Sequence, residues 1–247
     1  MNKLKIDDSI YLSKDDGNLK IDIFSKEKFL DVQSVKIKVL KDTDLVIESD
    51  TCNKKIDICI NILEDVHFNL YEFKKTSDCK FQYKYYLEKG SLLHVEKICD
   101  CDRAMDMVMF NLNGEGARVD YNLKTISKNM EKYIFMVYHN ANKTVSYINN
   151  NGVNIKDGSL EFNVSSFVPN HVKKCDVNQS GRIINNTEGE CVIKPNLFID
   201  EEDVTANHSA LIGTFSYDEI FYLMSRGISE EDAKLLLTKG FLLKGIS

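Results

Sequence analysis

The chain has 247 residues, of which 43% are hydrophobic and 28% charged, and its net charge is -6. This composition is typical of a soluble globular protein that is long enough for one large or two modest domains. The negative charge argues against a general binder of nucleic acid or anionic membranes, since both need a positive surface. The first residues, MNKLKIDDSIYL, lack the apolar stretch of a secretion signal. We therefore expect a cytosolic protein that binds neither membrane nor nucleic acid.

Short strands dominate the sequence pattern from residue 19 to residue 199. Each predicted strand alternates apolar and polar residues or is rich in β-branched and aromatic ones. Residues 102–110 are the stretch in which a helix competes most closely with a strand. The predicted strands are 19–24, 35–40, 45–49, 55–63, 67–73, 80–88, 92–98, 117–126, 132–139 and 159–167.

The missing helices between these strands argue against a βαβ fold, whose crossovers need helices. A sandwich, a barrel and a β-solenoid remain. The predicted strands outnumber those of a seven-stranded sandwich. Asparagine and glycine recur in the breaks, for example in YINNNG (147–152), and both tolerate tight corners. These features favour a solenoid slightly, although no strict repeat can be written.

The C-terminal residues predict two helices joined by a tight turn. Ser216 and Glu219 form a capping box before the apolar run IFYLM, and Gly227 is a natural residue to follow the first helix. Ser229 opens a second helix with acidic residues in its first turn. Gly240 is expected to end or bend that helix. The predicted division is a β-rich core over residues 1–214 and a helical pair over residues 215–247.

The seven cysteines and five histidines show no spacing that indicates a metal or redox site. An odd cysteine number in a reducing compartment argues against a disulfide framework. Cys99 and Cys101 are the closest pair and would point to the same side of a strand. We interpret them as small buried residues at a strand end, with a shared ligand as the alternative.

The segment DVTANHSALIGTFSYDEIFYLMSRGISEEDAKLLLTKGFL resembles the C-terminal signature of the SufB/SufD family, the scaffold proteins of SUF iron–sulfur cluster assembly. Upstream, LNGEGARVDY and IINNTEGECVIKPNLFIDEEDV resemble further family segments, so the resemblance covers residues 112–242. The positions that match the signature are Asp203, Val204, His208, Ala210, Gly213, Phe221, Tyr222, Leu223, Ser225, Arg226, Gly227, Ile228, Ala233 and Phe241.

The resemblance implies a right-handed parallel β-helix followed by a small helical domain. It further implies a non-enzymatic scaffold that works with an ABC-type ATPase, SufC, which docks on the C-terminal helices. Members of the family pair through their β-helices, as SufB–SufD heterodimers or as homodimers. Any iron–sulfur cluster or iron would be held only transiently, and no tightly bound cofactor is expected.

Two departures from the SufB pattern make the chain SufD-like. SufB proteins carry a cysteine fifteen residues before the proline that corresponds to Pro195, and this chain has Ser180 there. SufB proteins also have glutamate after the signature histidine, where this chain has Ser209. The histidine itself is kept as His208. The chain therefore resembles a compact, divergent SufD.

The candidate ligands follow from this resemblance and from the chemistry of soft and imidazole ligands. His208 is the main candidate for iron or a nascent cluster, with a structural hydrogen bond into the tail as the alternative. Cys191 is a weaker candidate, and Cys175 is another thiol away from the family's cysteine position. His139 is interpreted as structural.

The helical pair supplies the expected partner surface. Ile220, Leu223 and Met224 form one face that the second helix and the solenoid end should cover. Phe221 and Tyr222 point to other sides, where only a partner can cover them. The expected partner-binding residues are Ile220, Phe221, Tyr222, Met224, Arg226, Leu236 and Phe241.

Two other functional classes fit a β-solenoid. The first is a lyase or acyltransferase, since one fold can host unrelated functions. It would need a clustered acid–base constellation or a phosphate-binding loop, and neither stands out in the sequence. The second is a purely structural oligomeric solenoid, which would leave the C-terminal signature unexplained.

Overall fold

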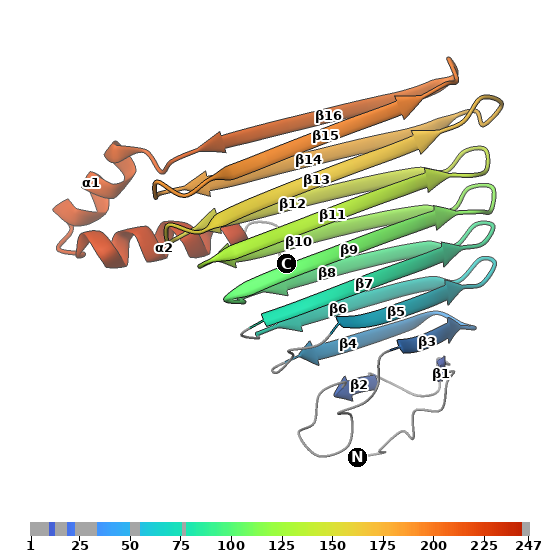
Figure 1. The fold of residues 1–247 in the computed structure, drawn as a ribbon, viewed down its shortest axis with the longest axis horizontal. Helices are drawn as coiled ribbons and strands as arrows, with labels where there is room; N and C mark the ends of the chain where they lie inside the picture. The colour runs from blue at the N-terminus through green and yellow to red at the C-terminus, as the bar shows by residue number, and fades with distance from the viewer. Residues whose placement is uncertain (1–9, 13–18, 23–33, 50–54, 76–77, 244–247) are drawn as a thin grey trace.

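The fold consists of two eight-stranded parallel sheets that the chain builds by alternating between them (Figure 1). The computed structural model describes residues 10–12, 19–22, 34–49, 55–75 and 78–243. The first sheet holds β1 (Ile10–Leu12), β3 (Ser34–Val39), β5 (Lys55–Ile62), β7 (Asp78–Leu87), β9 (Arg103–Leu112), β11 (Met130–His139), β13 (Ser159–Val168) and β15 (Cys191–Ile199). The second holds β2 (Leu19–Asp22), β4 (Thr43–Ser49), β6 (His67–Lys74), β8 (Leu92–Cys99), β10 (Arg118–Ser127), β12 (Val145–Asn154), β14 (Cys175–Asn185) and β16 (Val204–Gly213).

Each coil contributes one strand to each sheet, and every strand pairs in parallel with the equivalent strand of the next coil. This confirms the predicted parallel β-solenoid. Coil length varies along the chain: Asp78 pairs with Arg103, 25 residues later, whereas Leu160 pairs with Cys191, 31 residues later. The variation in coil length explains why no strict sequence repeat can be written.

Alternating burial defines the interior of the solenoid. Along β13 the inward side chains, such as those of Leu160 and Phe162, are fully buried, while the side chains between them face outward. Residues 102–110 follow the same rule, because Asp106, Val108 and Phe110 are buried in β9. A strand therefore replaces the competing helix interpretation, and tertiary pairing with β7 and β11 stabilises it.

The asparagine run at residues 149–154 lies inside β12, so the prediction of a corner there was wrong. The reason is that asparagines also pair between coils along the strands. The amide of Asn149 donates to the Asn122 side chain at 3.0 Å on the outer face, and Asn154, which is buried, donates to Asn185 at 3.2 Å. Because some inward residues of β12, such as Asn150, are polar, the sequence shows no clear apolar–polar alternation for this strand.

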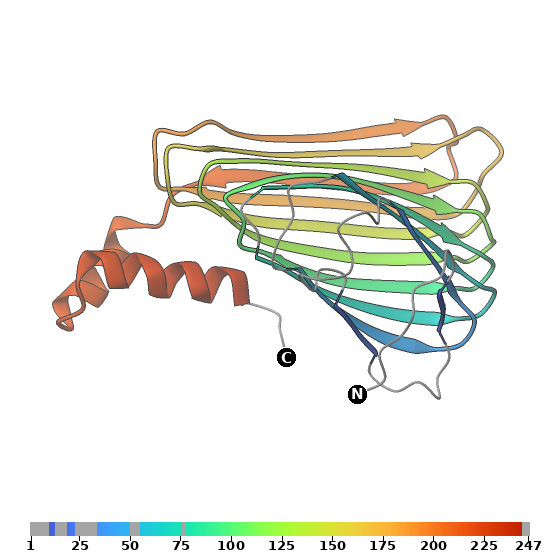
Figure 2. The same cartoon turned by 60° about the horizontal axis from the view of Figure 1, so that its bottom comes forward.

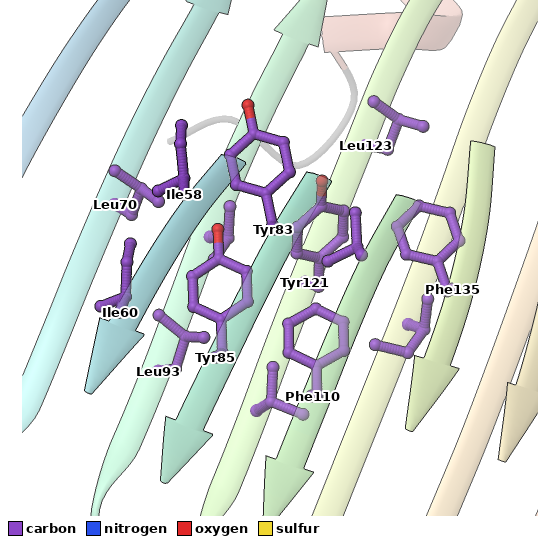
Figure 3. Close-up of a cluster of buried hydrophobic side chains, with 14 of the residues drawn as sticks. Ile58, Ile60, Leu70, Tyr83, Tyr85, Leu93, Phe110, Tyr121, Leu123 and Phe135 are labelled. Atoms are coloured by element: carbon purple, nitrogen blue, oxygen red, sulfur yellow. The ribbon is translucent and has the colours of Figure 1, made fainter. Parts of the chain in front are cut away.

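A stack of aromatic rings fills the middle of the solenoid (Figure 3). The rings of Tyr83 and Tyr85 are nearly parallel with centroids 6.1 Å apart, and Tyr85 stacks on Phe110 at 5.1 Å. Tyr121 then packs edge-on between Phe110 and Phe135. Offset and edge-to-face contacts of this kind contribute beyond the burial of apolar area. The phenol groups bring polar atoms into the same interior.

A buried quartet of charges lies beside this stack and consists of Glu72, Lys74, Lys97 and Asp106. Asp106 contacts Lys74 at 2.9 Å and Lys97 at 2.7 Å, while Lys97 contacts Glu72 at 2.9 Å. The Tyr83 hydroxyl also donates to Glu72. Burial alone would raise the pKa of Asp106, but the two lysines and their hydrogen bonds outweigh it and hold that pKa below its usual value. Two acids and two bases thus neutralise one another inside the core.

Two helices follow the last strand and lie at one side of the solenoid, next to the strand ends (Figure 2). The first, α1 (Tyr217–Ser225), has the predicted capping box of Ser216 and Glu219, and Gly227 follows it with φ of 87°. The second, α2 (Glu230–Leu243), continues through Gly240, so the expected break there was wrong. Leu242, which packs with Val153 and Ile184, holds this end of α2 on the solenoid. No helix in the described residues is long and apolar enough to cross a bilayer.

Candidate functional site

The last coil, which we call the open coil, is formed by β15 and β16 at the C-terminal end of the solenoid. Both strands are edge strands of their sheets. The inward positions of β13 are buried, whereas the equivalent positions of β15 are only half-buried because no further coil follows. Phe198, Leu211 and Ile212 are about half exposed here, at 52%, 50% and 46%. Edge strands with exposed apolar side chains are sites at which another chain can pair.

A column of outward aromatic rings leads to this edge. Tyr138 of β11 stacks on Phe167 of β13 at 4.9 Å, and Phe167 stacks on Phe198 of β15 at 4.9 Å. The column ends at Phe198 because β15 is the last strand of its sheet. One face of the Phe198 ring is therefore available for a further contact.

His208 lies midway along β16, beside Gln179 of β14. Gln179 is a buried inward residue whose amide donates to Ser166 at 2.8 Å and to the Asn196 carbonyl at 3.0 Å. His208 continues this inward column by one coil, but it is exposed because the open coil has no cover. Its imidazole is thus accessible to a ligand or to a partner chain at the end of the solenoid.

The two departures from the SufB pattern lie next to each other. Ser180 and Ser209 are paired across β14 and β16, and the Ser209 hydroxyl donates to the Ser180 hydroxyl at 3.1 Å. Both are one residue from the column of His208 and Gln179 and belong to the opposite face of the sheet. Their separation of 29 residues in sequence gave no sign that the two positions touch.

Three of the described cysteines, Cys99, Cys101 and Cys191, lie in or against the main apolar core. Cys191, at the start of β15, is half-buried against the main core, and burial raises the pKa of its thiol. Cys191 is paired with Leu160 at the start of β15. His208 is paired with Gln179, whose amide donates to the carbonyl of Asn196, five residues further along β15 than Cys191. Cys99 and Cys101 are fully buried, in agreement with the interpretation as small core residues. Within the described residues, no three His, Cys, Asp or Glu side chains gather as a metal-binding group.

His139 forms a buried hydrogen-bonded chain with its neighbours. Its ring nitrogens contact the hydroxyls of Thr144 at 2.7 Å and Ser146 at 3.0 Å, and Thr144 contacts the Cys175 thiol at 3.2 Å. Burial lowers the pKa of His139 to about 4, which keeps the ring neutral near pH 7. These contacts agree with a structural role for His139 and give Cys175 a partner inside the core.

The helical surface, defined as Tyr217, Phe221, Tyr222, Met224, Leu235 and Leu236, is the most exposed apolar region of the described chain. Helix α1 contains no buried residue, and Phe221 and Tyr222 are both 58% exposed. Ile220 and Leu223 are half-buried, as expected for the covered face, but Met224 is exposed and that part of the expectation was wrong. Met224 instead lines a groove with Ile220 and with Glu230 and Lys234 of α2, and that groove leaves its side chain accessible.

Two hollows flank this surface. A shallow one of about 350 Å³ is lined by Asp218, Glu219, Tyr222, Leu223 and Leu237. A larger groove of about 440 Å³ runs between α1, α2 and the loop after β14, with Ile220 and Met224 in its wall. The acidic residues at the start of α1 border an apolar floor. The shallow hollow therefore suits an apolar side chain that is flanked by positive charge.

The remaining predicted partner residues divide between the exposed surface and the core. Arg226 is exposed and lies over the ring of Tyr222, with the guanidinium carbon 5.3 Å from the centroid. Leu236 is 47% exposed. Phe241 is half-buried, packs on the cluster around Val153 and lies under Arg182, so it helps to fix α2 to the solenoid.

Sequence reasoning did not single out the exposed residues of the open coil. Phe198 and Leu211 lie in NLFID and SALIG, which alternate or cluster apolar residues like any buried strand. The signal that could have found them is their position: they come shortly before the capping box at Ser216, and no strand of the described chain follows that box to cover them.

Two coiled parallel sheets, an open coil and an exposed helical pair define the chain as a β-solenoid protein with an uncovered C-terminal end. Residues 65–241 match the family model for the SUF system FeS cluster assembly, SufBD core domain. This match covers more than half of the chain, so the chain belongs to the SufBD family, as its C-terminal signature predicted. Membership of this family associates the chain with iron–sulfur cluster assembly.

Known relatives agree with this assignment. The iron–sulfur cluster assembly protein SufD of Bacillus subtilis (strain 168) is 32% identical over 137 residues, which are 53% of this chain and 31% of that protein. SufD of Escherichia coli (strain K12) is 35% identical over 89 residues, 34% of this chain and 20% of that protein. A SufBD family protein of Pyrococcus horikoshii is 50% identical over 44 residues, 18% of this chain and 9% of that protein. The matched segments thus span less than a third of each relative.

Proposed function

We propose that the chain is a non-enzymatic scaffold component of a cytoplasmic SUF-type complex and that it works with a SufC-like ABC ATPase. The observation that carries this proposal is the helical surface, whose first helix is capped at both ends yet buries none of its residues. Burying one phenylalanine side chain contributes about 1.5–3 kcal/mol, so exposed Phe221 and Tyr222 are best explained by a partner. The ATPase docks on this surface, with Phe221 and Tyr222 near the centre.

The docking is tested by binding the purified cognate ATPase to a Phe221→Ala variant of the full chain. Aromatic anchors at the centre of an interface cost about 2 kcal/mol or more on truncation, which corresponds to about a thirtyfold loss of affinity. The matched control is Phe73→Ala, because Phe73 is 44% exposed on the outer face of β6, far from the helices in sequence. Unchanged affinity of Phe221→Ala would contradict the docking proposal.

Point variants are better suited to this test than removal of the helices. Leu242 and Phe241 pack with Val153 and Ile184 of the solenoid, so a chain truncated after Thr214 exposes part of the core. Phe221 makes no such contact: its neighbour is the ring of Tyr217, 6.1 Å away and itself exposed. A change in affinity of Phe221→Ala therefore reports on the interface rather than on folding.

A second solenoid, either a SufB/SufD-like partner or another copy of this chain, pairs with the open coil. The support is the combination of two edge strands with exposed Phe198, Leu211 and Ile212, and the aromatic column that ends at Phe198. A neighbouring strand could continue the backbone ladder of β16, while its side chains cover the inward column of His208. Pairing would then bury the iron-binding candidate at the junction of the two chains.

His208 contributes an imidazole to a transiently held iron ion or cluster at this junction. Its exposed place at the end of the inward column supports this role. After anaerobic reconstitution of the complex, His208→Ala should retain less iron and show a weaker cluster absorption, while its thermal stability stays that of the wild type. Equal iron content and equal spectra would contradict the ligand role, and a large drop in thermal stability would favour a structural one.

A further inference from the structure

The outer face of β9 and β11 carries a cluster of thioethers that the assembly function does not explain. The sequence of β9, RAMDMVMFNL, places a methionine at every second position. Asp106, Val108 and Phe110 point inward and are fully buried, so Met107 and Met109 point outward, where they are half-buried. Alternation thus brings successive thioethers to one face of a strand.

The neighbouring strand adds a third thioether at the matching height. Met136 of β11 is the direct partner of Met109, and Met107 is paired with Ile134. Adjacent strands are about 4.8 Å apart, and positions two residues apart on one strand are separated by about 6.6 Å. Methionine has three rotatable side-chain bonds, so sulfurs on Cα atoms this close can turn toward one point. Met107, Met109 and Met136 form a triangle, which we call the thioether triad.

The surroundings of the triad are suited to a soft, singly charged ion. Thioethers are uncharged soft ligands and select Cu(I) among biological metal ions, whereas hard divalent ions prefer oxygen. Lys84 is paired with Met109 on its other side, and its positive charge opposes a doubly charged ion more strongly than a singly charged one. The hydroxyl of Tyr138 donates weakly to the Met136 sulfur at 3.8 Å, so this sulfur is turned to the same outer face.

We propose that Met107, Met109 and Met136 form a binding site for one monovalent soft metal ion, Cu(I) or its redox-inert analogue Ag(I). The site lies on the outer face of the middle coils and is separate in sequence and sheet from His208 on β16. Binding needs no redox step and no proton release, because thioethers are neutral donors. It follows that the site keeps its affinity at acidic pH, where protonation weakens thiolate ligands.

The test is a titration of the full chain with Ag(I) at about pH 5, followed by NMR of ¹³C-methyl-labelled methionine. At this pH most of the seven cysteines are protonated, since a free thiol has a pKa of about 8.5. The methyl signals of Met107, Met109 and Met136 should shift together and saturate at one ion. A parallel anaerobic titration with Cu(I), buffered by a chromogenic Cu(I) chelator, measures the affinity.

Methionine-to-leucine variants show which methionines bind the metal, because leucine removes the sulfur but keeps nearly the same side-chain volume. Met109→Leu with Met136→Leu should lower the affinity by at least about tenfold, the scale of effect seen when metal surroundings are altered. The matched control is Met130→Leu, because Met130 also lies on β11, is 56% exposed and is paired with Arg103 at the strand start. This control should bind like the wild type.

Two results would overturn the proposal. In one, Ag(I) saturates the chain while the three triad methyl signals stay in place, which would assign binding to donors outside the triad. In the other, the double leucine variant binds Ag(I) and Cu(I) at pH 5 as tightly as the wild type. Circular dichroism of the double variant should match the wild type, because leucine and methionine are close in volume.

Discussion

The middle coils bury their inward aromatic side chains, whereas the C-terminal end of the molecule leaves aromatic side chains exposed. In the middle, Tyr83, Tyr121 and Phe162 are buried completely, and even charged groups are enclosed in the core. At the C-terminal end, Phe198 stacks on one neighbour and leaves its other face open, and α1 buries none of its residues. The same alternating sequence pattern thus gives a fully buried core in the middle coils and an uncovered surface at the C-terminal end.

The difference follows from what lies next to each coil. A middle coil has a neighbour on both sides, so every inward residue is covered by two layers. The open coil has a neighbour on one side only, and the helical pair lies next to the strand ends rather than over the coil (Figure 2). Stability of the isolated chain should therefore depend on the middle coils, whereas association should depend on the C-terminal end.

The largest effect is expected from Asp106→Ala in the buried quartet. Removing one partner leaves Lys74 and Lys97 buried with the single charge of Glu72, and breaking a buried ion pair costs about 3–5 kcal/mol. We expect the free energy of unfolding, measured by urea denaturation, to fall by about 5 kcal/mol. The control is Asp120→Ala, since Asp120 is ion-paired with Arg118 at the surface and should contribute less than about 1 kcal/mol.

Equal losses for the two aspartate variants would show that the quartet is no more important than a surface pair. A variant that replaces all four quartet residues by apolar ones of similar volume should recover much of the stability, because no uncompensated charge remains. Failure of that recovery would mean that the quartet sets the register of β6, β8 and β9 rather than merely neutralising itself.

A smaller effect separates two phenylalanines of the first sheet. Phe162→Ala in β13 should lower the free energy of unfolding by about 4 kcal/mol, because it empties a filled core position. Phe198→Ala in β15 should lower it by no more than about 1 kcal/mol, the value of one aromatic stack. Analytical ultracentrifugation should instead show weaker solenoid pairing for Phe198→Ala. Equal losses in the free energy of unfolding for the two variants would show that Phe198 is covered as fully as a core residue.

The smallest effect concerns pH and the buried His139. Its pKa is lowered from 6.5 to about 4 by burial, so the unfolded chain takes up a proton at a higher pH than the folded chain does. The stability that depends on neutral His139 is complete above about pH 6.5 and is lost as the pH falls toward 4. A shift of this size corresponds to about 3 kcal/mol. His139→Gln should remove this part of the pH dependence in urea denaturation curves recorded between pH 7 and pH 4.

Some elements of these two regions could be predicted from the sequence and others could not. The strands whose inward positions are apolar, such as β13, were found from their alternation, whereas β12 and β14 were hidden by buried polar residues, Asn150 and Gln179 among them. The capping residues Ser216 and Ser229 located both helices, because caps act through neighbours in sequence. Gly240 was misjudged, since α2 packs on the solenoid and that contact outweighs the local helix propensity of glycine.

The amino-acid sequence by itself determined the alternation of the strands, the caps of the two helices and the C-terminal signature that identifies the family. All of these depend on residues that lie close together in the chain. Only the tertiary structure decided that Ser180 meets Ser209, that Lys74 meets Asp106 and that Met109 meets Met136, because coils of changing length set these pairs. It also decided that Phe198 stays exposed while Phe167 is half-covered, since alternation marks a side of a strand but not whether another coil lies against it.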